Sequence, residues 1–217
     1  MKTRDYKASA VSLGLGSFLM IVTMVLHPLG DDIAGIQAIS LIAIISHSIA
    51  ISSVPFTYLG FKGFTRYLDS PWYFSQAGMS FFVFSSVTVI SAAAINGLAV
   101  PFFVEGLDAN DPNVDTAYWI LRYSFRLNRA YDYIFMGFAC GAVLCWSIAI
   151  LKSKRLPSGL GVFGLIIGAI GLGLVLFGRD LARLAEFRLF VFGYVAWIVW
   201  AGVALYRGAA KHTVDEG

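Results

Sequence analysis

The sequence is poor in charged residues. Only 13% of its 217 residues are charged and 58% are hydrophobic, whereas soluble domains average about 25% charged and about 45–50% apolar residues. This shortage excludes an ordinary soluble domain. Runs of about 20 mostly apolar residues are long enough to cross a bilayer. The sequence contains such runs at about 9–28, 36–60, 74–103, 117–151, 157–178 and 187–206.

These runs predict an all-α, polytopic membrane protein. Little chain is left between them, so we expect one integral membrane domain over residues 1–217, folded as a six-transmembrane-helix bundle with short loops. The basic start "MKTRDYK" resembles the opening of a secretory signal peptide. The apolar run that follows is too long and has no small-residue cleavage site, so we expect it to remain as a signal anchor.

Cysteine and catalytic motifs are also scarce. The only two cysteines, Cys140 and Cys145, lie five residues apart on one span, where their side chains diverge, so neither a disulfide nor a zinc site is expected. No HExxH-like motif and no nucleophile constellation occurs. The formal charge of +3 is spread over loops, which excludes a nucleic-acid-binding domain. We predict no cofactor and no nucleic-acid partner.

Lysine is confined to one side of the predicted membrane. If the spans alternate in direction, all six lysines share a side with Arg4, Arg66, Arg155 and Arg207. The positive-inside rule makes that side, and with it both termini, cytoplasmic. The opposite, outer face has acidic and arginine-bearing loops but no lysine. This charge distribution predicts a multi-pass protein of the cell membrane.

The fourth span begins with an unusual row of arginines. At about 100° per residue, one helix face carries Arg122, Arg126 and Arg129. A continuous helix over 117–151 would be about 52 Å long, so its excess over a hydrocarbon core of about 30 Å should stand in the outer headgroup layer. The arginines either pair with nearby acids and lipid phosphates as interface anchors, or turn inward and bind an anionic ligand.

Asp132 lies about one turn deeper on the same span and needs a partner. Arg129 can reach it along the helix, and Arg179 or Arg183 at the outer end of the fifth span can reach it across the bundle. A structural arginine–aspartate clamp and a functional carboxylate both fit this pattern.

Two more polar side chains lie within predicted spans. His47 is near the middle of the second span and Asn96 is about two turns below the outer end of the third. A neutral imidazole bonded to a facing helix explains His47, with proton handling or ligand binding as the alternative. Asn96 is expected to bond across helices, with ligand contact as the alternative.

His27 ends the first span, and Asp31 and Asp32 follow in the outer loop. One histidine and two carboxylates suit a divalent metal or acid–base chemistry, but an interfacial histidine beside an acidic loop explains them equally simply. His47 is about 16 Å further along a helix that starts near the same surface, so it is not expected to join them. No metal site is predicted.

The joint between the fourth and fifth spans carries a recognisable layout. A span ends in a short basic hinge with Lys152 and Lys154, then Leu156 and Pro157, then a Leu160–Gly161 pair that opens a glycine-bearing span. This layout resembles a bacterial family of six-helix integral membrane proteins with a domain of unknown function. The resemblance implies a six-helix bundle in a bacterial inner membrane and supplies no catalytic residues.

These patterns together predict an accessory or binding protein with an arginine-rich outer pocket for an anionic amphiphile, a lipid headgroup or a membrane partner. The residues expected around it are Arg122, Arg126, Arg129, Asp132, Arg179, Arg183, Asn96 and His47. The alternatives are a membrane-embedded enzyme that acts on a lipid or isoprenoid through Asp132, His27 or His47, and a small transporter. Glycines at 161, 164, 168 and 171 form one stripe, which predicts close helix packing within the chain or between copies.

Overall fold

The computed structural model describes residues 3–28, 30, 32–69, 72–108, 112, 114–177 and 184–215. The helices are α1 (Thr3–Leu26), α2 (Ile33–Leu68), α3 (Trp72–Ala94), the π-helix η1 (Ile95–Ala99), α4 (Val100–Val104), α5 (Val114–Ser153), α6 (Ser158–Leu176) and α7 (Leu184–Asp215). Six helical stretches are long and apolar enough to cross a membrane, with α3, η1 and α4 acting as one. The described residues include no strand. The prediction of an all-α, multi-pass membrane protein is confirmed.

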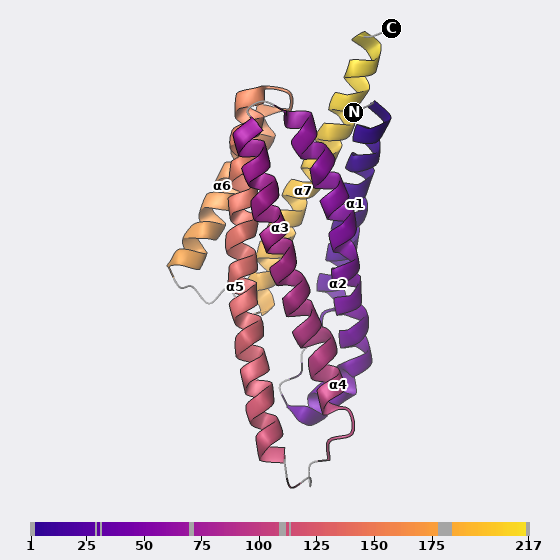
Figure 1. The fold of residues 1–217 in the computed structure, drawn as a ribbon, viewed down its shortest axis with the longest axis vertical. Helices are drawn as coiled ribbons and strands as arrows, with labels where there is room; N and C mark the ends of the chain where they lie inside the picture. The colour runs from indigo at the N-terminus through magenta and orange to yellow at the C-terminus, as the bar shows by residue number, and fades with distance from the viewer. Residues whose placement is uncertain are drawn as a thin grey trace.

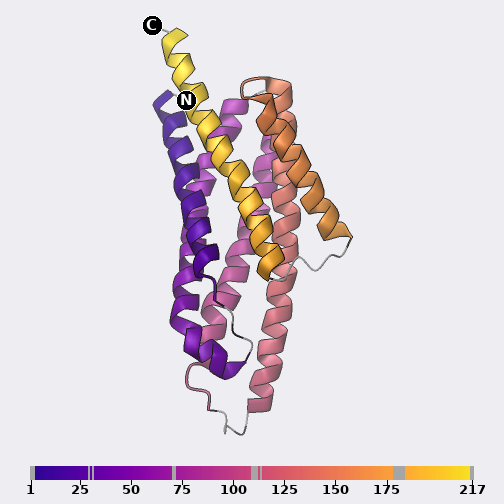
Figure 2. The ribbon, with the colours of Figure 1, turned by 180° about the vertical axis from the view of Figure 1, so that it is seen from behind.

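Both chain ends lie at one end of the bundle, which we call the terminal end; the opposite end is the distal end (Figure 1). The helices differ greatly in length. At about 1.5 Å per residue, the 19 residues of α6 span about 28 Å and the 40 residues of α5 about 60 Å. The distal parts of α2, α4 and α5 consequently project beyond the ends of α1, α6 and α7 (Figures 1 and 2).

This distal projection has a small core of its own. Its buried residues come from the starts of α2 and α5 and from α4, namely Ile33, Ile36, Val100, Val104, Ala117 and Leu121. Gln37 of α2 donates from Nε2 to the carbonyl oxygens of Val104 and Leu107, at 2.7 and 2.9 Å. These carbonyls follow the last turn of α4, where helices leave such groups without a partner in the helix. The projection is therefore a packed three-helix unit.

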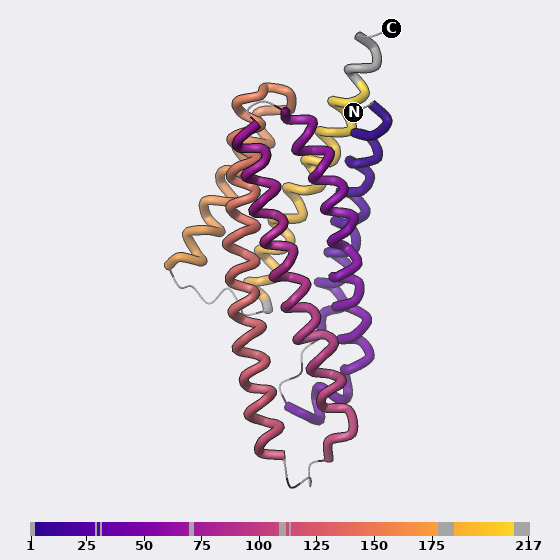
Figure 3. Tube along the Cα trace, in the orientation of Figure 1, coloured from indigo at the N-terminus to yellow at the C-terminus, as the bar shows by residue number. Residues whose placement is uncertain are grey.

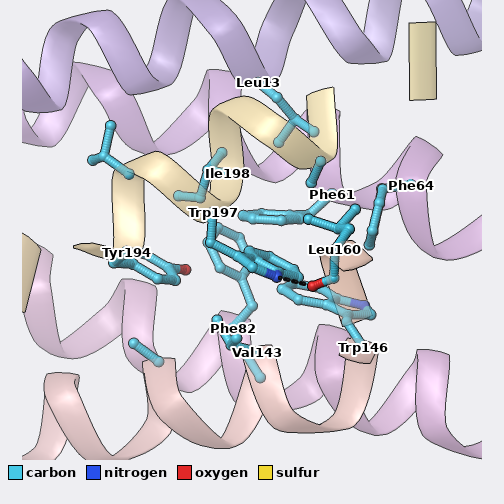
Figure 4. Close-up of a cluster of buried hydrophobic side chains, with 14 of the residues drawn as sticks. Leu13, Phe61, Phe64, Phe82, Val143, Trp146, Leu160, Tyr194, Trp197 and Ile198 are labelled. Atoms are coloured by element: carbon cyan, nitrogen blue, oxygen red, sulfur yellow. Dashed lines mark hydrogen bonds between the residues drawn. The ribbon is translucent and has the colours of Figure 1, made fainter. Parts of the chain in front are cut away.

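The main core is built on stacked aromatic rings (Figure 4). The rings of Phe61 and Trp146 stack with centroids 4.2 Å apart, and Trp197 lies 6.1 Å from Trp146. Trp146 donates from Nε1 to the Thr65 hydroxyl at 3.1 Å, and Trp197 donates to the Leu160 carbonyl at 3.3 Å. Each indole nitrogen thus has an acceptor inside an apolar core.

The predicted glycine stripe packs α6 closely on α5. Gly161, Gly164, Gly168 and Gly171 are all buried. A Cβ at 168 would lie 2.8 Å from Leu144, and one at 164 would overlap Ser147 of α5 and Trp197 of α7. Within the chain, this confirms the prediction of close helix packing. Toward its distal end α6 leans away from the bundle axis (Figure 3), and α6 packs far more on α5 than on α7.

Candidate functional site

The predicted arginine row lies on the distal projection of α5. Arg122 and Arg126 are exposed and Arg129 is half-buried. The guanidinium of Arg122 lies over the Trp119 ring, 5.4 Å from its centroid, and that of Arg129 lies 6.0 Å from the Tyr133 centroid. Neither of the two cavities described below is lined by these arginines. The row therefore lies on the surface of the projection and borders neither cavity.

Asp132 is half-buried on α5, and its Oδ2 accepts a hydrogen bond of 3.0 Å from Asn128 Nδ2. Asn128 lies four residues earlier on the same helix, and the sequence interpretation did not consider it as a partner. Arg179 and Arg183, the expected partners across the bundle, lie outside the described residues. Asn96 is half-buried within η1, beside Gly97.

His27 and His47 lie together, contrary to the sequence interpretation. Their ring centroids are 4.8 Å apart. The expected separation of about 16 Å assumed that α1 and α2 reach the same depth. Instead α1 ends at Leu26, beside the middle of α2, and the chain continues beyond it to the start of α2 in the projection (Figure 2).

The histidine pair has a defined tautomer. Nδ1 of His27 lies 3.0 Å from the Pro28 carbonyl oxygen and Nδ1 of His47 lies 2.8 Å from that of Ala43. A carbonyl oxygen only accepts, so each neutral ring donates from Nδ1 and carries its lone pair on Nε2. Burial, the neighbouring His47 ring and the charge of Arg188 lower the pKa of His27 to about 4. The neutral form is thus favoured.

η1 fits against this pair. A Cβ at Gly97 would overlap the His47 ring, so only glycine allows η1 to approach α2 this closely. Pro101 follows within α4 and lacks an N–H. A π-turn just before it is one of the usual ways in which a helix absorbs such a defect. η1 and His47 therefore form one packing unit.

The acidic loop does not complete a metal site in the part of the chain that the structure describes. Asp32 caps α2, with its Oδ1 accepting from the Gly35 N–H at 2.7 Å. Asp31 lies outside the described residues. No three His, Cys, Asp or Glu side chains among the described residues lie close enough to hold a metal ion. The recorded hydrogen bonds also join neither histidine to a carboxylate, as an acid–base pair would require.

The larger of two cavities in the described structure was not foreseen from the sequence. It is a groove of about 770 Å³, open on one side, between α5, α6 and α7. Ala139, Cys140 and Val143 of α5 line it, with residues between Ile167 and Leu174 of α6 and between Glu186 and Tyr194 of α7. α6 leans away from the bundle axis toward its distal end (Figure 3). The walls of the groove are almost wholly apolar.

Two polar atoms in the groove wall lack partners. Glu186 Oε2 and Tyr194 Oη are enclosed and have no hydrogen-bond partner among the described residues. An enclosed polar atom without a partner destabilises a protein by about 1–3 kcal/mol, and by more when it is charged. Each such atom in a native fold calls for an explanation, such as a functional role. The sequence signal was a glutamate in the first turn of a mostly apolar span.

Tyr194 also borders a second, smaller cavity of about 70 Å³ inside the bundle. Hydroxyl groups from three other helices face it, those of Thr23, Ser53, Thr57, Ser85 and Ser86. Their recorded hydrogen bonds run mostly to backbone carbonyls of their own helices. The lining of this interior space is mostly apolar, and Tyr194 is shared between it and the groove.

Arg188 connects α7 to the end of α1. It donates from a terminal guanidinium nitrogen to the His27 carbonyl oxygen at 3.0 Å. That carbonyl follows the last turn of α1, where a cation is favourable. The side chain is thus directed toward α1, whereas Glu186, two residues earlier on α7, faces the groove.

Comparisons with known proteins give no relative: no family model, no curated protein and no solved structure matches this chain. The resemblance to the bacterial six-helix family stays a prediction.

Proposed function

We propose that this protein binds an amphiphile, taken from the surrounding lipid, in the groove between α5, α6 and α7. Its role is that of an accessory or binding protein of the cell membrane. The observation that carries the proposal is an apolar groove of about 770 Å³ with two enclosed, unpartnered polar atoms in the described part of its wall.

The size and lining of the groove suit such a ligand. Small-molecule sites are concave, mostly apolar and about 300–1,000 Å³ in volume, with a few polar groups that orient the ligand. Because α6 and α7 are both membrane-spanning, the open side of the groove faces hydrocarbon. A ligand can therefore enter sideways from the bilayer without crossing water.

The enclosed polar atoms argue against simple filling by lipid tails. A hydrocarbon chain can satisfy neither the carboxylate of Glu186 nor the hydroxyl of Tyr194, because it has no hydrogen-bonding group. A ligand with a polar end and an apolar body satisfies both parts of the groove. This is why an amphiphile fits better than an apolar molecule.

The arginine row supports a second contact with anionic groups. Taking the lysine-rich terminal end as cytoplasmic places the distal projection outside the cell. Arg126 and Arg129 then lie within about 10 Å of the outer edge of the hydrocarbon core, near the lipid phosphates. Planar guanidinium groups suit phosphate oxygens. We propose that the row anchors the projection on anionic headgroups of the outer leaflet or on a membrane partner.

Filling the groove tests its role. Gly193 lines the groove and an added Cβ there meets no atom within 4 Å, so Gly193→Leu should occupy the space without disturbing the fold. The measurement is the affinity of the protein in lipid nanodiscs for pyrene-labelled hexadecanol, followed by fluorescence. We expect Gly193→Leu to weaken binding about tenfold or more, which corresponds to about 1.4 kcal/mol.

Gly173→Leu is the matched control. Gly173 lies on α6, also has open space around its Cβ position and does not line the groove. Its affinity for the probe should equal that of the wild type. Equal affinities for all three proteins, or no binding to any of them, would contradict the proposal.

A further inference from the structure

We infer that the ligand of this groove carries a cationic ammonium group that is held by Glu186. The inference rests on the proposed amphiphile binding and names the chemistry of the ligand's polar end. It differs from the anionic ligand that the arginine row predicted, because that row lies on the distal projection of α5 and does not line the groove.

Glu186 stands at the end of a helix that favours negative charge. It lies in the first turn of α7, which begins at Leu184. Unpaired N–H groups and the helix dipole stabilise a negative charge at this end of a helix. Glu186 also lines the groove, with Oε2 enclosed and lacking a partner in the described structure. The site is thus a carboxylate directed into an apolar space.

No cationic side chain among the described residues lines the groove. Arg188 is the nearest arginine on α7 within the described residues. One of its terminal guanidinium nitrogens donates to the His27 carbonyl on α1, and its enclosed Nε makes no hydrogen bond to Glu186 Oε2. Residues two apart on a helix do not share a face. The arginines at 122 and 126 are exposed on the distal projection and do not line the groove. A cation for Glu186 can therefore come from a ligand.

The positions of Glu186 and Tyr194 along α7 determine which way a bound ligand points. Glu186 is near the distal end of α7, and Tyr194 lies eight residues, or about 12 Å, further into the bundle. The groove wall between them is apolar, with Leu189, Phe190 and Gly193. An amphiphile places its head near the membrane surface and its chain toward the interior. The head consequently meets Glu186 and the chain runs past Gly193 toward Tyr194.

Charge strengthens the contact. A hydrogen bond between an ammonium group and a carboxylate is about twice as strong as one between neutral groups. Low polarity around the pair strengthens it further, whereas an anionic head beside Glu186 would be repelled. The groove should therefore rank ligands of equal chain length by head charge, with the cation first and the anion last.

Competition in nanodiscs of phosphatidylcholine tests this order. Hexadecylamine, hexadecanol and palmitate would each displace pyrene-labelled hexadecanol from the wild-type protein. We expect the amine to act at least tenfold more strongly than the alcohol, and palmitate to act most weakly. Equal displacement by all three, or strongest displacement by palmitate, overturns the inference while leaving the groove itself supported. If the probe does not bind at all, both the groove and the inference fail.

Variants assign the effect to one residue. Glu186→Gln keeps the shape and removes the charge, so it should abolish the preference for the amine and leave hexadecanol unchanged, which also checks the fold. Glu105→Gln, at an exposed acid after α4, should keep the wild-type order. A preference for the amine that persists in Glu186→Gln overturns the assignment. The ligand order of the wild type remains decisive even if Glu186→Gln does not fold.

Two kinds of ligand can supply the ammonium group. One is a membrane lipid with an ethanolamine headgroup, and the other is a single-chain lipophilic cation. Nanodiscs with increasing phosphatidylethanolamine separate them. Reduced hexadecylamine binding as this lipid is added supports the lipid source. Unchanged amine binding supports the single-chain cation. Either result keeps the requirement for Glu186, whereas amine binding that depends on neither the lipid nor Glu186 contradicts it.

Discussion

At the scale of single residues, the polar groups inside the bundle fall into two kinds. Most of the buried serines and threonines donate a hydrogen bond from the hydroxyl to a carbonyl oxygen of their own helix, as Thr57 does to Ser53 at 3.1 Å. Such bonds satisfy the group locally and need no partner helix. Glu186 and Tyr194 have no such local bond. Ser17 and Ser147 also lack a partner in the described structure, but only Glu186 and Tyr194 line the groove.

The His27–His47 contact makes stability depend on pH. The pKa of His27 is lowered from 6.5 to about 4, and the groups facing it, His47 from α2 and Arg188 from α7, both oppose a positive charge. Below pH 6.5 the unfolded chain binds a proton that the folded protein does not. Stability is therefore complete above pH 6.5 and falls as pH drops toward 4, by about 1–3 kcal/mol for this group.

Thermal unfolding in detergent between pH 7.5 and 4 measures this loss. The variant His27→Asn has no ionisable side chain at the position, so its unfolding temperature should vary less over the same range. Identical pH dependence in the two proteins would show that His27 keeps its ordinary pKa in the fold.

At the scale of helices, α6 depends on its glycines for its place on α5. Gly164→Val should lower the free energy of unfolding by about 1–3 kcal/mol, because the added atoms overlap Ser147 and Trp197 and force the helices apart. Gly173→Val makes the same change on the same helix where the added Cβ has open space. Denaturation with increasing sodium dodecyl sulfate would compare the two variants. Equal loss in both would mean that helix propensity, and not packing, sets the effect.

The helices themselves could be read from the sequence, since hydropathy identifies each apolar stretch without reference to its neighbours. The relative depth of the helices could not. Hydropathy gives no register between helices of unequal length, so the meeting of His27 with His47 was missed. The groove was missed for a related reason: it depends on how α5, α6 and α7 are tilted against one another, and tilt depends on packing between helices. Glu186 alone hinted at it, as an acid in an apolar span.

The packing of the distal projection is a second feature that could not be predicted from the sequence. The excess length of α5 was predicted, with the expectation that it lies in the headgroup layer. In the structure α2 and α4 continue beside it and share a core with it. Aromatic side chains remain exposed on this unit, with Trp119 at 67% and Tyr123 at 68%. Exposed aromatic rings beside arginines are typical of interfaces with partners or headgroups.

At the scale of the whole molecule, the two ends of the bundle differ in chemistry. The terminal end carries lysines, including Lys152 over the Phe74 ring at 4.5 Å, and an ion pair of 3.4 Å between Arg155 and Asp69. The distal end carries exposed acids and arginines without lysine. The groove opens between these ends, with its carboxylate toward the distal side. The orientation of the protein in the membrane thus decides which leaflet would supply the amphiphile that we propose for the groove.

The positive-inside rule predicts that the terminal end faces the cytoplasm, and labelling tests this directly. In a background where Cys140 and Cys145 are replaced by alanine, single cysteines are placed at Ser158 and Glu105, which are exposed at the terminal and distal ends. A membrane-impermeant maleimide added to intact cells should label Glu105→Cys and not Ser158→Cys, whereas both should react after the membrane is opened. Labelling of Ser158→Cys alone would reverse the orientation. The groove would then draw its amphiphile from the inner leaflet, because its Glu186 end would face the cytoplasmic surface.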